Sequence, residues 1–425
     1  MMKERRIHTK RWLTQCGKVP GALALLLIAA MLPVACTDGT QLPEQGLAPE
    51  DAITFSATAG TATRAAGETG NLEALKGSTG FGVFASYTRQ WRYTTTTVSP
   101  DFLCNQRVVW TEVSPSSGTW TYTPLKYWPN GEGEATDQTQ GETAHQVSFF
   151  AYAPWSDLTT TSPDSHAPAN CITDCSQTYE QGDPWVLYRI AGKEIDPIPD
   201  DGIDERDPTA QQVDLLYAVC DYSHYGMGDG LCNIDLTKPA TNQRIPFTFR
   251  HALGIVGDKV TVSVSDDLKT ALNDEVTTGG ATAISLVLQS ITIDYTLTSK
   301  ARLMLFARDG QPNWKTVTSE NVKTTRTVSL KDIAETLYST DGTSASYEWN
   351  GKGVFYIPIE GDDYVQRARI TIGYSVVRTG GTTYPTSGEA TTSKNVVLHE
   401  QKSYGPGQKM NFNISLSSSI TLKED

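Results

Sequence analysis

The chain has 425 residues, of which 20% are charged and 38% apolar; this argues against disorder and suggests about two folded domains. The formal net charge is −13, and beyond the first 35 residues 29 Lys and Arg face 47 Asp and Glu, a net −18. Such an acidic surface disfavours nucleic acid and anionic lipid as direct partners. Abundant Thr, Ser and Gly, without long helical periodicities, favour an all-β fold.

Residues 1–35 have the features of a bacterial export signal. Six basic residues occur up to position 18, and the apolar run that follows, 21–32, is too short to cross a membrane comfortably. The run leads into the letters LPVAC, and small residues directly before Cys36 resemble the lipobox of bacterial lipoproteins. In that motif the cysteine is acylated and becomes the first residue, so lipidation with palmitate is expected at Cys36. The alternative is ordinary secretion with a coincidental cysteine.

The stretch after Cys36 predicts a tether, a strand and a cleavable loop. Residues 36–52 are polar with Pro and Gly, as in a flexible tether. Ile53–Thr58 alternates apolar and polar residues, which predicts a short strand. The following residues, 59–70, are small and rich in Thr and Gly, with Arg64 as their single basic residue. This composition predicts an exposed loop of the kind that proteases cut.

Short strand patterns recur along the rest of the chain, separated by turn signals, as in β-sandwich proteins. They cover residues 80–87, 107–112, 118–123, 147–153, 212–219, 244–250, 259–264, 283–297, 301–307, 353–359, 367–377, 395–398 and 410–416. Leu330–Tyr338 is predicted to be a short helix, and Leu72–Lys76 one helical turn. A domain boundary is expected near residue 265. The strand pair over 244–264 would close a first sandwich (53–265), and Asp266–Asp274 would begin the crossing to a second one (266–425).

Five cysteines follow Cys36, and this odd number leaves at least one without an intrachain partner. They are Cys104, Cys171, Cys175, Cys220 and Cys232. Export permits disulfides, and proximity in sequence suggests the pairs Cys171/Cys175 and Cys220/Cys232, although connectivity stays open. The spacing of zinc ligands is absent.

No catalytic or cofactor motif stands out. The letters GFGVFA at 80–85 match a dinucleotide-binding pattern, but they begin a strand instead of joining a strand to a helix. Motifs of serine hydrolases, zinc proteases and P-loops are absent from the sequence. The acidic residues between Asp200 and Asp207 are interpreted as a solvated loop, with a calcium site as the alternative. We therefore expect no enzyme activity, no cofactor and no metal.

Seven of the aromatic residues between positions 120 and 155 are interpreted as sandwich core, with a sugar-stacking platform as the alternative. They are Trp120, Tyr122, Tyr127, Trp128, Phe149, Tyr152 and Trp155.

The first and last strands carry the most informative pattern. Ile53, Phe55 and Ala57 form one apolar face just before the cleavable loop. Near the C-terminus, the apolar residues again all fall on one face, at Met410, Phe412, Ile414 and Leu416. These are either two ordinary edge strands, or a strand that can be removed and a strand that can be donated. Removing a strand leaves an apolar groove with unpaired backbone groups, which accepts a neighbour's strand.

The ordered set of motifs resembles the fimbrillins, the fimbrial-subunit family of Bacteroidales bacteria with Mfa-like and FimA-like members. The matching stretches are the region of Cys36, residues 53–65, 80–87, 102–110, 120–131, 147–154, 213–219, 245–254 and 404–416. The resemblance implies two tandem transthyretin-like β-sandwich domains. It also implies that an arginine-specific protease cuts between Arg64 and Ala65, removing the lipid and the first strand. The vacated groove would accept a strand from another subunit, namely the strand with Met410, Phe412, Ile414 and Leu416.

The hypothesis from the sequence is therefore a structural subunit of a cell-surface fimbria, polymerised by donor-strand exchange and serving adhesion and biofilm formation. Its expected partners are other fimbrial subunits, the protease and, before cleavage, the outer membrane through the lipid. The alternative is a fimbrial tip adhesin or lipid-anchored surface protein that binds host glycan or protein.

Overall fold

The computed structural model describes residues 52–59, 75–76, 79–89, 93–94, 96, 98–114, 117–129, 145–158, 171–190, 213–219, 233–239, 243–279, 281–298, 300–307, 311–317, 323–350, 353–359, 366–379, 388–397, 406–417 and 421–424. All of them lie in one compact unit, 48–425, and the other unit, 1–47, lies outside them. The described elements are strands, apart from α2 (Asp266–Thr277) and a helical turn at Leu75 and Lys76. The predicted all-β class is confirmed.

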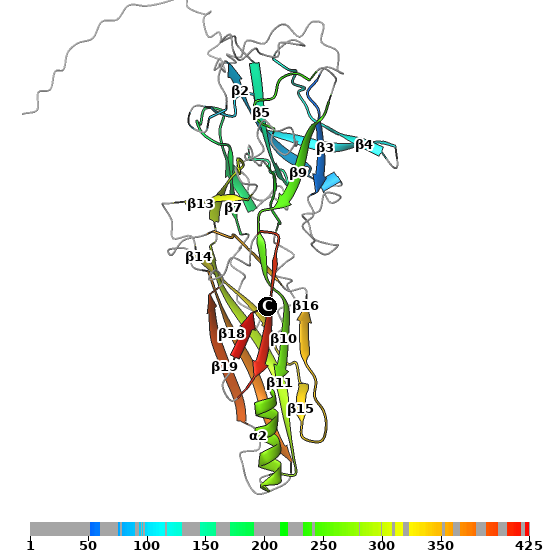
Figure 1. Cartoon of the computed structure of the whole chain (residues 1–425), viewed down its shortest axis with the longest axis vertical. Coiled ribbons are helices and arrows are strands. Elements are labelled where there is room, and N and C mark those ends of the chain that lie inside the picture. The colour runs from blue at the N-terminus through cyan, green and yellow to red at the C-terminus, as the bar shows by residue number, and fades with distance from the viewer. Residues whose placement is uncertain are drawn as a thin grey trace, which may run out of the picture. The chain divides into compact units, whose positions relative to one another are not determined.

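Seven strands form a closed barrel, with its labelled strands visible in Figure 1. Around the barrel they are β1 (Phe55–Ala59), β4 (Ser117–Thr121), β3 (Leu103–Ser114), β2 (Phe81–Arg89), β5 (His145–Ala153), β8 (Leu216–Ala218) and β9 (Ile245–His251). Neighbours are antiparallel except for β1 and β9, which are parallel. The first strand in the chain thus joins strand β9 to strand β4 and closes the barrel.

Alternation along the barrel strands divides their side chains between two apolar clusters. In β2, Phe81, Val83 and Ala85 face the barrel interior, whereas Phe84 belongs to the larger cluster outside it. The barrel interior is rich in aromatic rings, including Phe55, Phe81, Trp120, Phe149, Phe247 and Phe249. The predicted core role is confirmed for four of the seven named aromatics, which are buried: Trp120, Tyr122, Phe149 and Tyr152.

A four-stranded sheet combines segments that are far apart in the sequence. Its order is β13 (Asn313–Lys315), β12 (Lys300–Met304), β7 (Trp185–Arg189) and β6 (Ile172–Cys175). Because β7 pairs with β12, strands from both sides of the predicted boundary near residue 265 share one sheet.

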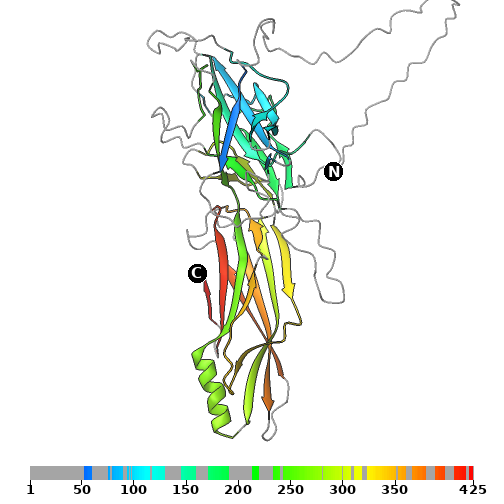
Figure 2. The same ribbon diagram turned by 90° about the vertical axis from the view of Figure 1, so that its right-hand side faces the viewer.

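Two further sheets contain most of the later strands. The first has the order β16 (Tyr347–Asn350), β10 (Gly254–Val264), β20 (Lys409–Leu416) and β21 (Thr421–Glu424), with β17 (Val354–Tyr356) also on β10. The second has the order β14 (Lys323–Leu330), β11 (Ala283–Thr298), β18 (Arg367–Thr379) and β19 (Gly388–Val397), with β15 (Glu335–Ser339) also on β11. Figure 2 shows the red β20 alongside the green β10.

The strand pair expected over 244–264 does not close one sandwich. Strand β9 pairs with β1 and β8 in the barrel, whereas β10 pairs with β16, β17 and β20 from later in the chain. The hydrogen-bond partners therefore change between His251 and Gly254. The domain limits stay a prediction, and this change of partners is where we would place the boundary.

The prediction of a helix over Leu330–Tyr338 is wrong. Strand β14 ends at Leu330 and β15 begins at Glu335, and both pair with β11. Between them, Asp332 and Ala334 have φ of 56° and 49°, which a right-handed helix does not allow. The long strand β11 offers hydrogen bonds to two successive segments, and this tertiary pairing overrides the local helical pattern.

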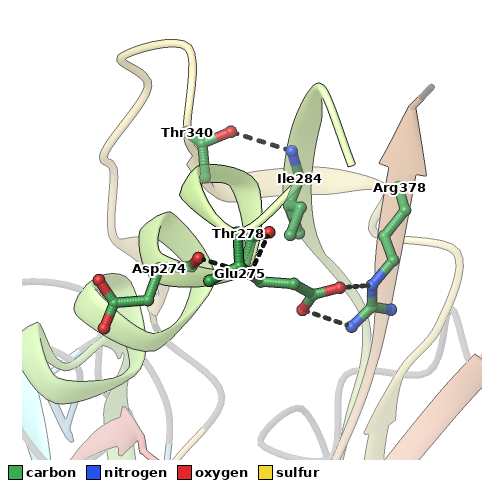
Figure 3. Close-up of polar contacts among 6 residues, drawn as sticks. All are labelled: Asp274, Glu275, Thr278, Ile284, Thr340 and Arg378. Atoms are coloured by element: carbon green, nitrogen blue, oxygen red, sulfur yellow. Dashed lines mark hydrogen bonds and ion pairs between the residues drawn. The ribbon is translucent and has the colours of Figure 1, made fainter. Parts of the chain in front are cut away.

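The helix α2 instead occupies residues that the sequence suggested as a domain crossing. Two acidic residues occupy its first turn, and Leu268, Leu272 and Val276 contact the large apolar cluster from one face. Figure 3 shows how Arg378 of β18 holds the end of this helix: its Nε and Nη2 donate to Glu275 at 2.5 and 3.0 Å. The two hydrogen bonds from Arg378 hold the pKa of Glu275 below its usual range.

Replacing Glu275 with Gln should lower the free energy of unfolding by about 0.5–1 kcal/mol at pH 7, since the ion pair is partly exposed. The pKa of Glu275 is lower in the folded than in the unfolded protein, so the ion pair contributes its full stabilisation above the unfolded pKa of about 4.3. This stabilisation is lost as the pH falls through the lower, folded-state pKa. Urea denaturation at pH 7 and pH 3 measures the effect. The neighbouring, exposed Asp274→Asn is the matched control. A Glu275→Gln effect that persists undiminished at pH 3 would contradict the assignment.

Candidate functional site

The first strand lies in a slot between two segments of the barrel. Phe55–Ala59 runs parallel to Ile245–Phe249, residue for residue, and Phe55 is also opposite Trp120 on β4. Just before the strand, Ile53 donates its N–H to the carbonyl of Lys126 at 2.8 Å, and Ile245 donates to the carbonyl of Thr54 at 2.8 Å. The segment is thus bonded to β9 along Phe55–Ala59 and, at its start, to the β4 side of the slot through Ile53 and Phe55.

The side chains of this segment are an integral part of the barrel core. Ala52 and Ile53 are each 1% exposed, and Phe55 is fully buried. The Phe55 ring lies 5.4 Å from Tyr122, 5.5 Å from Phe247 and 6.0 Å from Phe149, measured between ring centroids. Each large side chain of this kind contributes about 1.5–3 kcal/mol by burial. Removing the segment would therefore open an aromatic groove between β4 and β9.

Tyr122 lines the slot with a polar group as well as an aromatic ring. Its hydroxyl donates to the carbonyl of Ile53 at 3.0 Å and accepts from the N–H of Lys126 at 3.2 Å. Burial raises the pKa of Tyr122 to about 12, so the hydroxyl stays a neutral donor at physiological pH. A backbone carbonyl supplied by any strand in this slot would meet the same donor.

The predicted donor residues are buried in this chain's own fold. In β20, Met410, Phe412 and Leu416 are each 1% exposed and Ile414 is 2% exposed, with the residues between them more exposed. Their neighbours in the apolar cluster include Val256, Val260 and Val262 of β10. The alternation predicted from the sequence is therefore present.

Strand β20 has a partner on both of its edges. It runs parallel to β10 from Ile255 to Val264, and it pairs antiparallel with β21 through Phe412–Ser415. In the described part of the chain, β21 pairs with β20 alone, which makes it the edge strand of this sheet. Freeing β21 breaks four residue pairs, whereas freeing β20 also breaks its ladder with β10.

The other predicted site residues have no described geometry. Cys36, Arg64 and Ala65 lie outside the described residues, as do Cys220, Cys232 and the acidic run around Asp204. What sequence reasoning missed is the parallel pairing of β1 with β9 and the hydroxyl of Tyr122 in the slot. Strand alternation carries no signal for such a distant partner, whereas the aromatic motif at 120–131 did include Tyr122.

Within the described residues, no group of three or more His, Cys, Asp or Glu is arranged to hold a metal ion. Among the same residues, no helix is both long and apolar enough to span a membrane.

Comparisons with known proteins point to one class, a bacterial fimbrial subunit fold. No family model matches the chain. A curated relative, the fimbrium subunit Fim1C of Phocaeicola vulgatus, is 28% identical over 134 residues, which cover 31% of this chain and 30% of the relative. The chain thus matches less than a third of that relative's length.

A solved structure gives the likeness over the whole fold. The crystal structure of a fimbrial protein from Bacteroides vulgatus aligns with a TM-score of 0.54 at 17% identity, covering 88% of this chain and 98% of the other. At this identity the likeness concerns the fold. Together, the two comparisons confirm the resemblance to the fimbrillin family that the sequence motifs indicated.

Proposed function

We propose that this chain is a fimbrial subunit at the cell surface that assembles by exchanging its first strand for the strand of a neighbouring subunit. The observation that carries the proposal is the position of residues 52–59, which fill a slot bonded on both edges and lined by aromatic rings. The comparisons with fimbrial proteins support a structural, non-enzymatic role in fimbriae.

In this proposal the precursor is exported as a lipoprotein acylated at Cys36 and is carried to the outer membrane. An arginine-specific surface protease then cuts between Arg64 and Ala65, five residues beyond the end of β1. The cut separates β1 from the rest of the barrel, and the strand is afterwards held by non-covalent contacts alone. Its loss would leave the unpaired edges of β4 and β9 as a template for strand addition.

The donor in this proposal is the C-terminal segment with Met410, Phe412, Ile414 and Leu416. Its side-chain alternation matches that of Ile53, Phe55 and Ala57 in the slot. If the donor runs in the direction of β1, Phe412 takes the place of Phe55, and Met410 that of Ile53. Repeating this step head to tail gives an open filament. Because β20 has its own ladder with β10, donation requires this ladder to open, or the edge strand β21 to serve in its place.

Limited trypsin digestion of the purified full chain tests the proposal. We expect a new N-terminus at Ala65, found by mass spectrometry, and a ladder of SDS-resistant oligomers in unboiled samples. Arg64→Ala should abolish both the new N-terminus and the ladder, whereas Arg189→Ala, an exposed residue on β7, should change neither. A ladder that forms equally well with Arg64→Ala would contradict activation by this cut.

A tip adhesin or lipid-anchored binding protein is the second candidate. It predicts a clean cut at Arg64 without a ladder, or no cut at all, together with binding to host glycan or protein. In the described residues, the most exposed large apolar side chains are Tyr179 (79%) and Val113 (74%), and no described tryptophan is among the exposed ones. The aromatic sugar platform suggested by the 120–155 region therefore has little support.

A further inference from the structure

Two cysteines that are far apart in the sequence approach each other beside the barrel. Cys104, on β3, is half-buried and contacts the large apolar cluster, which includes the buried Cys175 at the end of β6. The Sγ of Cys104 lies 3.2 Å from the carbonyl oxygen of Ser176, the residue that follows Cys175. Both side chains are thiols in the structure.

A network of hydrogen bonds fixes the backbones that carry these thiols. Asn105, next to Cys104, accepts a 2.7 Å hydrogen bond from the buried hydroxyl of Tyr152. The same hydroxyl accepts from the N–H of Ser156 at 3.3 Å, and the hydroxyl of Ser156 donates to the carbonyl of Ile172, on β6, at 3.2 Å. The region around β3, β5 and β6 is therefore held together independently of the cysteines.

The pair Cys171/Cys175 suggested by the sequence is ruled out by the strand between them. Residues Ile172–Cys175 form β6, and four residues of extended chain span about 13 Å at 3.3 Å per residue. A disulfide requires Cα atoms about 4–7 Å apart. Any partner of Cys175 must therefore lie on another element, and among the described cysteines it is Cys104 on β3 that lies beside it.

We propose that Cys104 and Cys175 are a disulfide-forming pair that joins barrel strand β3 to strand β6 in the folded protein. The oxidant is a small-molecule or protein disulfide. One thiolate attacks this disulfide and releases one thiol; the other thiolate then attacks the mixed disulfide, forms the Cys104–Cys175 bond and releases the second thiol. Two protons and two electrons leave the cysteines in total. In the cell, the bond rests on the proposed export of the chain, since exported proteins meet oxidising conditions.

Burial determines when this bond forms. It raises the pKa of Cys175 to about 12 and that of Cys104 to about 11. At neutral pH the folded dithiol has almost no thiolate, the form that attacks disulfides. Oxidation therefore occurs before the thiols are buried, and the completed bond is protected from reduction.

Disulfide mapping of the full chain tests the proposal without depending on export or assembly. The reduced, unfolded chain is refolded with oxidised and reduced glutathione, its remaining thiols are alkylated in denaturant, and it is digested with trypsin and an Asp-specific protease. We expect the peptide DFLCNQR (101–107) linked to DCSQTYEQG (174–182). Cys171 lies on a separate peptide, 164–173, so the two candidate partners are distinguished.

Two variants and one order-of-addition experiment complete the test. Cys171→Ser should keep the linked peptide, whereas Cys104→Ser should lose it. Adding oxidised glutathione only after reduced protein has folded should form the bond at least tenfold more slowly than adding it during refolding. Recovery of Cys104 from the wild-type chain as an alkylated thiol, or joined to another cysteine, would overturn the proposal. That result would leave the ladder experiment, and hence the proposed function, unaffected.

Discussion

Phe55→Ala is expected to destabilise the barrel and, at the same time, to speed the assembly of the cleaved subunit. The ring is fully buried among Tyr122, Phe149 and Phe247, so its loss should lower the free energy of unfolding by about 3–5 kcal/mol. The same contacts hold β1 in its slot after the cut at Arg64. A weaker hold should let the strand dissociate faster, and the ladder should appear sooner.

These two opposite effects distinguish a removable strand from an ordinary core strand. Urea denaturation followed by tryptophan fluorescence gives the stability, and the time course of the ladder after trypsin gives the assembly rate. Thr58→Ser, at an exposed position of the same strand, keeps the hydroxyl that bonds to Phe247 of β9; it is the control and should change stability by less than about 0.5 kcal/mol. If the Phe55→Ala variant is less stable but forms its ladder more slowly than the wild type, release of β1 is not a step in assembly.

A synthetic peptide of residues 409–416, KMNFNISL, is expected to block the ladder when it is added to the trypsin-cleaved subunit. The peptide would fill the slot left by β1 and could not continue the filament. Deleting these residues from the chain is a poor test, because β20 supplies four buried side chains to the subunit's own sheet. The peptide leaves that sheet intact and examines the donor sequence alone.

The matched control is the same peptide with alanine in place of Phe412. If Phe412 occupies the pocket of Phe55, the alanine peptide should need about a 100-fold or higher concentration for equal inhibition. A second peptide, residues 417–425, represents the edge strand β21. Inhibition by this peptide in place of KMNFNISL would assign the donor role to β21. Equal inhibition by the Phe412 and alanine peptides would contradict the placement of Phe412 in the pocket.

Much of the strand content could be predicted because alternation is a local signal. The alternation of apolar and polar residues predicts the apolar faces of 53–57 and 410–416, and Phe55, Phe412 and the residues two positions away on the same faces are buried, apart from the half-buried Ala57. The helix α2 also has local signals, with acidic residues in its first turn and apolar residues spaced by four, but these were interpreted as a domain crossing. The false helix at 330–338 shows the reverse case, in which pairing with β11 overrides a helical pattern.

The arrangement of the candidate site could not be predicted, because it depends on partners distant in the sequence. Nothing near Phe55 specifies that it lies beside Ile245 in a parallel pair or opposite Trp120. In the same way, the approach of Cys104 to Cys175 follows from how β3 and β6 are packed. Proximity in sequence suggested Cys171 instead.

The parallel pairing of β1 with β9 has a consequence for how the subunit folds. The paired residues are 190 positions apart. Contacts of such high sequence separation form slowly, because a long loop must close before the ladder stabilises it. Since the proposed export places folding after translocation, the barrel of the exported chain would lack its last ladder until this loop closes. Folding catalysts and chaperones acting on the newly made chain would have their greatest effect in this period.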